Sequence, residues 1–82
     1  MTSEEILAKL KPIIAIYLPE DVSVSAIEEN SSLTGELNIN SAHLVDIVLD
    51  VEDAFDIEFA NQDMEALHTV KNAIEIIQEK IT

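Results

Sequence analysis

The chain has 82 residues and a formal net charge of -13, from 17 acids against 4 bases. This length leaves room for one domain over residues 1–82, in which most apolar residues must share a single core. So acidic a surface repels phosphate groups, which excludes nucleic acid and anionic membranes as partners and favours basic protein patches. The chain contains no cysteine, so it has neither a disulfide nor a thiol nucleophile of its own.

Composition also limits the fold class and the location. The chain has one glycine and two prolines, which favours helices joined by polar loops over a series of short strands. The longest apolar run, residues 13–18, is far too short to span a membrane, and the acidic start lacks the bases of a signal peptide. We therefore expect an all-α, cytoplasmic, monomeric protein without membrane insertion.

The first predicted helix begins at a capping box, in which Thr2 precedes Glu5 by three residues. Apolar residues then recur at helical spacing, namely Ile6, Leu10, Ile13 and Tyr17. Pro12 lies inside this pattern, and its ring removes a backbone hydrogen bond. A kink or a restart of the helix is therefore expected near Lys11.

A long polar segment, residues 19–40, separates the first helix from the second. It is rich in Ser, Asn and Glu, and its short apolar anchors are Val22, Val24, Ile27, Leu33, Leu37 and Ile39. A loop of this length is uncommon in a small domain and usually has a function. We expect it to be held onto the core by these anchors.

Three further helical segments follow the loop. The second helix is capped by Asn40 or Ser41 and ends near Phe55, and a short third helix is capped by Asn61 and ends near Leu67. The residues that begin the fourth helix and form its apolar stripe are Thr69, Val70, Ile74, Ile77 and Ile81. The sequence thus predicts a four-helix bundle of three longer helices and one short helix, with a long loop between the first two.

The second helix has an acidic side opposite an apolar side, because successive helical residues advance by about 100°. The acids of the acidic side are Asp46, Asp50 and Asp53, and the apolar residues opposite them are Leu44, Val48, Val51 and Phe55. Val45 and Leu49 lie between the two sides. Any one of these acids alone is an ordinary solvated side chain, but without nearby bases the three together predict a docking edge beside an apolar centre.

Neither catalysis nor a metal site is expected from the residues. Ser41 and His43 are the residue types of a nucleophile and a base, but residues two apart on a helix point in different directions. The segment 30–41 has the oxygen-bearing residues and the glycine of a calcium loop, yet lacks acids at its first and last positions. Ser41 is therefore either an ordinary helix cap or the place where the protein's chemistry is attached.

The segment 32–77 resembles the acyl carrier proteins. Their pattern is a leucine four residues before a modified serine, an acid-lined helix ending in Phe-Asp, a short third helix and a Thr-Val start to the last helix. The residues that match it are Leu37, Ser41, Asp46, Phe55, Asp56, Leu67, Thr69 and Val70. The first helix and the loop also fit in length and character, so the resemblance covers essentially the whole chain.

The resemblance implies that a phosphopantetheinyl transferase attaches 4'-phosphopantetheine to Ser41. The thiol at the end of this group would then carry acyl groups as thioesters. The chain would serve acyl-loading and condensing enzymes of fatty acid or polyketide type biosynthesis without being an enzyme. The residues expected to bind the basic patches of these partners are Asp46, Asp50, Asp53, Val45, Leu49 and His43. An aminoacyl or peptidyl carrier and an unmodified acidic interaction module of the same fold remain as alternatives.

The residues around the serine depart from the family's usual Asp-Ser-Leu-Asp. Asn40, Ala42 and His43 stand at the matching positions, so two acids and one exposed apolar side chain are replaced. Asn40 still favours a helix cap. Because these positions are read by the transferase and by condensing enzymes, the changes imply a specialised member of the family.

Overall fold

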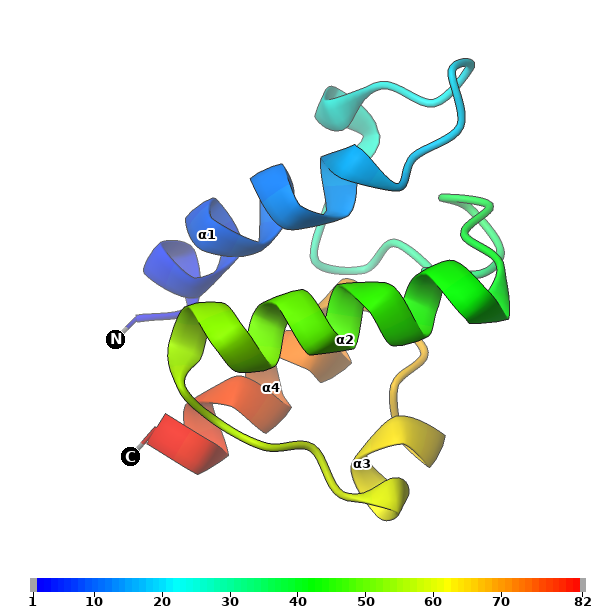
Figure 1. Cartoon of the computed structure of the whole chain (residues 1–82). Coiled ribbons are helices and arrows are strands. Elements are labelled where there is room, and N and C mark those ends of the chain that lie inside the picture. Colours follow the sequence, from blue (N-terminus) through cyan, green and yellow to red (C-terminus); the bar gives the residue numbers. More distant parts are fainter. Residues whose placement is uncertain (1, 82) are drawn as a thin grey trace.

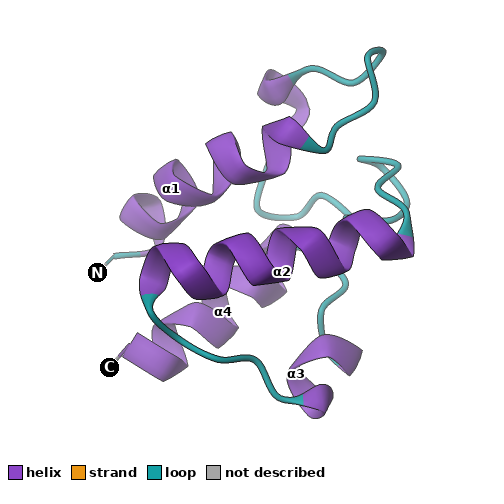
Figure 2. Ribbon diagram, in the orientation of Figure 1, coloured by secondary structure: helices purple, strands orange, loops and turns teal. Residues whose placement is uncertain are grey.

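The computed structural model describes residues 2–81, which form four α-helices and one short 3-10 helix (Figures 1 and 2). The elements are α1 (Ser3–Ile16), η1 (Val24–Ala26), α2 (Ser41–Phe55), α3 (Asn61–Glu65) and α4 (Val70–Ile81). No strand occurs in this part of the chain, and the predicted all-α bundle with its long loop between the first two helices is confirmed. Within the same residues, none of the helices has the length and apolarity needed to span a bilayer.

The start of α1 is the predicted capping box. The Thr2 side-chain oxygen accepts the Glu5 N–H at 3.2 Å, and the Glu5 carboxylate accepts the Thr2 N–H at 3.1 Å. The helix continues through Pro12 without a break, so a restart at this point does not occur. Leu10 and Ile14 are buried on either side of the proline, and their packing holds both halves of α1 against the rest of the bundle.

One hydrophobic core joins α1, α2, α4 and the long loop, and α1 contacts both α2 and α4. Each large apolar side chain buried there contributes roughly 1.5–3 kcal/mol to folding. The buried residues are Ile6, Leu10, Ile14, Ile27, Leu33, Leu37, Ile39, Ile47, Val48, Val51, Leu67, Val70, Ala73, Ile74, Ile76 and Ile77. Four of the six loop anchors are therefore part of the core.

Some of the residues that are buried differ from those that the apolar spacing predicts. Ile13 and Tyr17 are only partly buried, whereas Ile14 is fully buried. Ile47, on the flank of the expected apolar side of α2, is also buried. Val24 was expected to anchor the loop, but it begins the 3-10 helix η1 and remains 47% exposed. The apolar spacing gives the directions of side chains on one helix, but the packing of neighbouring helices decides which of them are covered.

The second half of the loop is fastened to the start of α4. The Val70 N–H donates to the Ser31 carbonyl at 3.1 Å, and the Lys71 N–H donates to the Glu29 carbonyl at 2.7 Å. The first N–H groups of a helix have no partner within the helix. Loop carbonyls satisfy them here, so the loop and α4 stabilise each other's position.

The short helix α3 starts one residue earlier than a cap at Asn61 would place it. Asn61 is its first helical residue, Ala60 occupies the cap position, and the helix ends at Glu65 rather than near Leu67. The Asp63 carboxylate accepts the Ala60 N–H at 2.8 Å. Because alanine has no side-chain acceptor, this bond from within the helix stabilises the start of α3.

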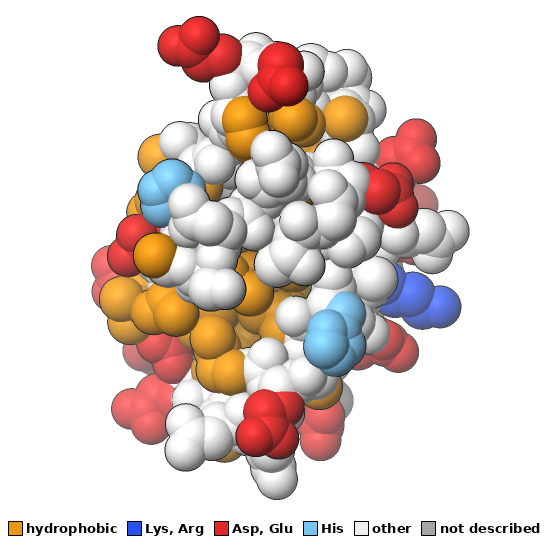
Figure 3. All heavy atoms as spheres, turned by 90° about the vertical axis from the view of Figure 1, so that its right-hand side faces the viewer, with side chains coloured by type: hydrophobic (Ala, Val, Ile, Leu, Met, Phe, Trp, Pro, Cys, Tyr) orange, Lys and Arg blue, Asp and Glu red, His pale blue; other side chains and the backbone are white. Residues whose placement is uncertain are grey.

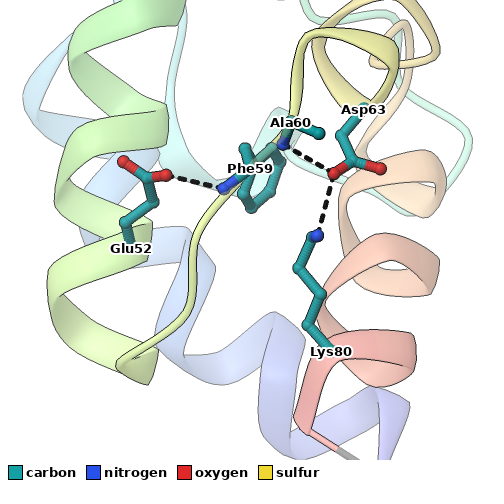
Figure 4. A network of polar contacts seen from close by, with 5 residues as sticks. All are labelled: Glu52, Phe59, Ala60, Asp63 and Lys80. Carbon is teal, nitrogen blue, oxygen red and sulfur yellow. Dashed lines mark hydrogen bonds and ion pairs between the residues drawn. The ribbon is translucent and has the colours of Figure 1, made fainter.

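A polar network fastens α3 and the segment before it to α2 and α4 (Figure 4). The Glu52 carboxylate of α2 accepts the Phe59 N–H at 2.6 Å. The Lys80 ammonium of α4 pairs with the Asp63 carboxylate at 2.8 Å and lies 6.0 Å from the centre of the Phe59 ring. Two contacts hold the pKa of Asp63 below its ordinary value of 3.8: the one with Lys80 has the larger effect, and the hydrogen bond from Ala60 has the smaller one.

Replacing Lys80 with Met should raise the pKa of Asp63 and reduce stability at neutral pH. A carboxyl whose pKa is lowered by folding contributes stability above its unfolded pKa, and this contribution is lost as the pH falls through the folded pKa. Urea unfolding should therefore show a difference between Lys80→Met and the wild type that shrinks at acid pH. Lys71→Met is the matched control, because Lys71 forms no ion pair within residues 2–81; a pH-independent loss in Lys80→Met would contradict the assignment.

Candidate functional site

The start of α2 is determined by Asn40. Its backbone is extended, with φ -77° and ψ 166°, and its side-chain oxygen accepts the His43 N–H at 2.8 Å. The Asn40 carbonyl accepts the first helical hydrogen bond, from the Leu44 N–H at 2.9 Å. Leu37 and Ile39, just before the cap, are buried and hold the incoming chain on the core. Of the two predicted caps, Asn40 is the one that forms.

Ser41 is consequently the first residue of α2 without being its cap. Its side chain is exposed. Within residues 2–81, no hydrogen bond engages its hydroxyl, its own N–H or the N–H of Ala42. The two N–H groups and the positive end of the helix dipole favour a negative group at this point. The site therefore combines an accessible hydroxyl with a local environment that suits a phosphate ester on Ser41.

The His43 side chain is directed toward α1. Its ring centre lies 5.6 Å from that of Tyr17, with the two ring planes tilted by 46°. His43 is exposed, whereas Tyr17 is half-buried. The contact places Tyr17, the residue that follows α1, beside the first turn of α2.

The three aspartates of α2 do not have the same surroundings. Asp46 and Asp53 are exposed and make no hydrogen bond or ion pair within the described part of the chain. Asp50 is half-buried, and its carboxylate accepts a hydrogen bond from the Tyr17 hydroxyl at 2.7 Å. This hydrogen bond, then burial and then the charges of Asp50 and Asp46 raise the pKa of Tyr17 above its ordinary value of 10.0.

The same region exposes apolar surface. Val45 is 48% exposed and Leu49 is 56% exposed, one helical turn apart on α2. Figure 3, which faces the end of the molecule where α2 begins, shows hydrophobic side chains gathered next to acidic ones. An apolar patch bordered by charge is the usual composition of a protein interface. Among residues 2–81, no group of three or more His, Asp or Glu side chains is arranged to hold a metal ion.

Tyr17 is the residue of this site that the sequence analysis did not assign to it. The helical spacing placed it in the apolar stripe of the first helix, and its ring does pack against the core. A half-buried tyrosine generally finds a hydrogen-bond partner for its hydroxyl. The sequence could have signalled that a partner exists, but Asp50 lies 33 residues away and only the packing of α1 on α2 identifies it.

Comparison with known proteins agrees with the resemblance found in the sequence. No protein-family model matches the chain. It is 38% identical over 73 residues to the acyl carrier protein of Desulforapulum autotrophicum, an alignment covering 89% of this chain and 94% of that protein. It is 35% identical over 81 residues to the acyl carrier protein of an Exiguobacterium species, covering 99% and 100% of the two chains. The chain belongs to the acyl carrier protein family.

A further member, the acyl carrier protein of Buchnera aphidicola subsp. Schizaphis graminum, is 35% identical over 72 residues, or 88% of this chain and 89% of that protein. Acyl carrier proteins are carriers and not enzymes, and they typically hold phosphopantetheine. In this member of the family, the exposed Ser41 hydroxyl and the two N–H groups beside it fit such a group.

The assignment of the cap leads to a contrast between two neighbouring substitutions. Asn40→Ala removes the acceptor of the His43 N–H and should reduce the free energy of unfolding by ~1 kcal/mol. Ser41→Ala removes a hydroxyl that makes no hydrogen bond to any of residues 2–81 and should change stability by less than ~0.5 kcal/mol. Urea unfolding of both variants measures the difference; a larger loss for Ser41→Ala would make Ser41 the cap.

Proposed function

We propose that this chain is a discrete acyl carrier protein whose Ser41 bears a 4'-phosphopantetheine arm. The arm, once attached, supplies a thiol that holds acyl intermediates as thioesters for enzymes of fatty acid or polyketide type biosynthesis. The supporting observation is the Ser41 hydroxyl, which is exposed and makes no hydrogen bond within the described residues, because Asn40 performs the capping. A carrier needs this imported sulfur, since the chain contains no cysteine.

The chain's own residues have three tasks in the attachment. Asn40 sets the first turn of α2, so that the Ser41 oxygen is presented at the surface. That oxygen would form the new bond to the phosphorus of coenzyme A's phosphopantetheine and give its proton to the transferase. The bond between this phosphorus and the bridging oxygen of the diphosphate would break, and the nucleotide half of coenzyme A would leave with its own phosphate. The N–H groups of Ser41 and Ala42 then favour the negative charge of the phosphodiester.

The proposed docking surface for partner enzymes consists of residues on α2. Asp46, Asp50 and Asp53 supply the charge, Val45 and Leu49 supply the apolar part, and His43 borders the attachment site. Long-range attraction to basic patches would speed association with the transferase and with acyl-loading and condensing enzymes. His43 and Ala42 replace the acid and the leucine usual in the family, which supports a specialised carrier with partners of its own.

We also place this carrier in the cytoplasm as a monomer and a single domain over residues 1–82, whose two end residues lie outside the described part. The acidic composition supports these assignments. The exposed patch on α2 is compatible with transient partners, which cover such a surface only while bound.

The attachment is tested by intact mass. Incubation with coenzyme A and a broad-specificity phosphopantetheinyl transferase should raise the mass by one phosphopantetheine unit. Ser41→Ala should abolish the gain and leave the helical circular dichroism unchanged. A gain that persists in the variant moves the site elsewhere, and no gain in the wild type favours the unmodified interaction module.

Docking through α2 is tested by charge reversal. Replacing Asp46 and Asp53 with Lys should slow modification of Ser41, most at low salt, because steering sums over charges and is screened by ions. Even an exposed ion pair contributes only ~0.2–1 kcal/mol to stability, and these two exposed acids have no such pair within residues 2–81, so thermal unfolding should change little. The control reverses Glu75 and Glu79, exposed acids of α4, with the same change in net charge; equal slowing by both pairs would exclude a localised docking surface.

A further inference from the structure

The contact between Tyr17 and Asp50 connects α1 to the proposed docking surface. The Tyr17 hydroxyl donates to the Asp50 carboxylate at 2.7 Å. A carboxylate that accepts a hydrogen bond from a half-buried phenol is restricted to few side-chain conformations. The exposed carboxylates of Asp46 and Asp53 lack such a restraint within the described residues, so the three acids of the surface are unequal.

The hydrogen bond from Tyr17 holds the Asp50 carboxylate in a region where like charges repel one another. Asp46 and Asp53 each lie about one helical turn from Asp50 on α2. Within residues 2–81, the ion pair is the one between Lys80 and Asp63, so no base neutralises these three acids. Crowded like charges destabilise a compact state. A hydrogen bond at the protein surface makes only a modest net contribution to stability against this repulsion. Stability alone therefore gives a weak reason for this arrangement, whereas a cationic partner would neutralise the repulsion.

The position of Tyr17 also relates to Ser41. Its ring contacts His43 at 5.6 Å between centres, and His43 is in the first turn of α2 together with Ser41. An enzyme that reaches the Ser41 hydroxyl has to cover this turn. It would then meet the Tyr17 ring and the Asp50 carboxylate at the junction of α1 and α2.

We propose that Tyr17 is a positioning residue of the docking surface, which holds the Asp50 carboxylate at the junction of α1 and α2 for an arginine or lysine of the partner enzyme. The inference rests on the proposed function in taking α2 as the docking helix, and it extends that surface onto α1. A cation placed there gains from the carboxylate and from the face of the Tyr17 ring. Fixing the carboxylate before binding lowers the entropy lost on association.

The protonation state of Tyr17 supports this role at working pH. Its pKa lies above the ordinary value of 10.0, because the hydroxyl bonds to Asp50 and the neighbouring carboxylates disfavour a phenolate. The phenol therefore stays protonated at neutral pH and keeps its donor toward Asp50.

The test measures docking without chemistry. In a Ser41→Ala background, isothermal titration calorimetry gives the affinity for a broad-specificity phosphopantetheinyl transferase in the absence of coenzyme A. Adding Tyr17→Phe, which keeps the ring and removes the hydroxyl, should weaken binding by about fivefold. Asp50→Asn should weaken it at least as much, and Tyr17→Phe combined with Asp50→Asn should cost nothing beyond Asp50→Asn alone.

Ser3→Ala is the matched control, because the Ser3 hydroxyl accepts a hydrogen bond from Gln78 at 3.2 Å and so joins α1 to α4 instead. It should leave the affinity unchanged. An unchanged affinity in Tyr17→Phe, an equal loss in Ser3→Ala, or no measurable binding of the Ser41→Ala parent would each overturn the inference. The mass gain of the wild type reports separately on the attachment, so a failure of the proposed function is distinguishable from a failure of this role.

Discussion

The hydrogen bond from the His43 N–H to the Asn40 side chain determines where α2 begins, and with it what Ser41 can do. A serine at a helix start is ordinarily the cap, and a capping hydroxyl is committed to a backbone N–H. Here Asn40 makes that contact at 2.8 Å and Ser41 is left exposed. The incoming chain is held by the buried Leu37 and Ile39, so the position of the serine depends on one cap and two core contacts.

Among residues 2–81, no cation forms an ion pair with an acid of α2. Lys80 is bound to Asp63 and Lys9 lies over the ring of Phe55, 5.5 Å from its centre. No base neutralises Asp46 or Asp53 within residues 2–81. The result is an uncompensated acidic surface on α2, which costs stability by self-repulsion and which, under the proposed function, would attract basic partners.

The long loop and α3 hold the rest of the bundle in place through backbone groups. Loop carbonyls accept the first N–H groups of α4, and Glu52 accepts the Phe59 N–H between α2 and α3. Helix ends are where backbone groups lack partners, so these contacts both satisfy unpaired groups and fix the connections. A small domain with a single core depends on such connections, because few buried residues remain to stabilise each segment.

The sequence by itself determined the all-α class, the four helices and a serine at the start of the second, because capping residues and apolar spacing act within a few residues of each other. It left Asn40 and Ser41 as equal candidates for the cap, because both residue types accept an N–H and backbone conformation selects between them. Only the tertiary structure decided that Ile47 is buried, that Val24 is exposed and that Tyr17 binds Asp50. Spacing along one helix gives relative directions, but the angle and position at which α1 packs on α2 decide which of those directions meet a partner.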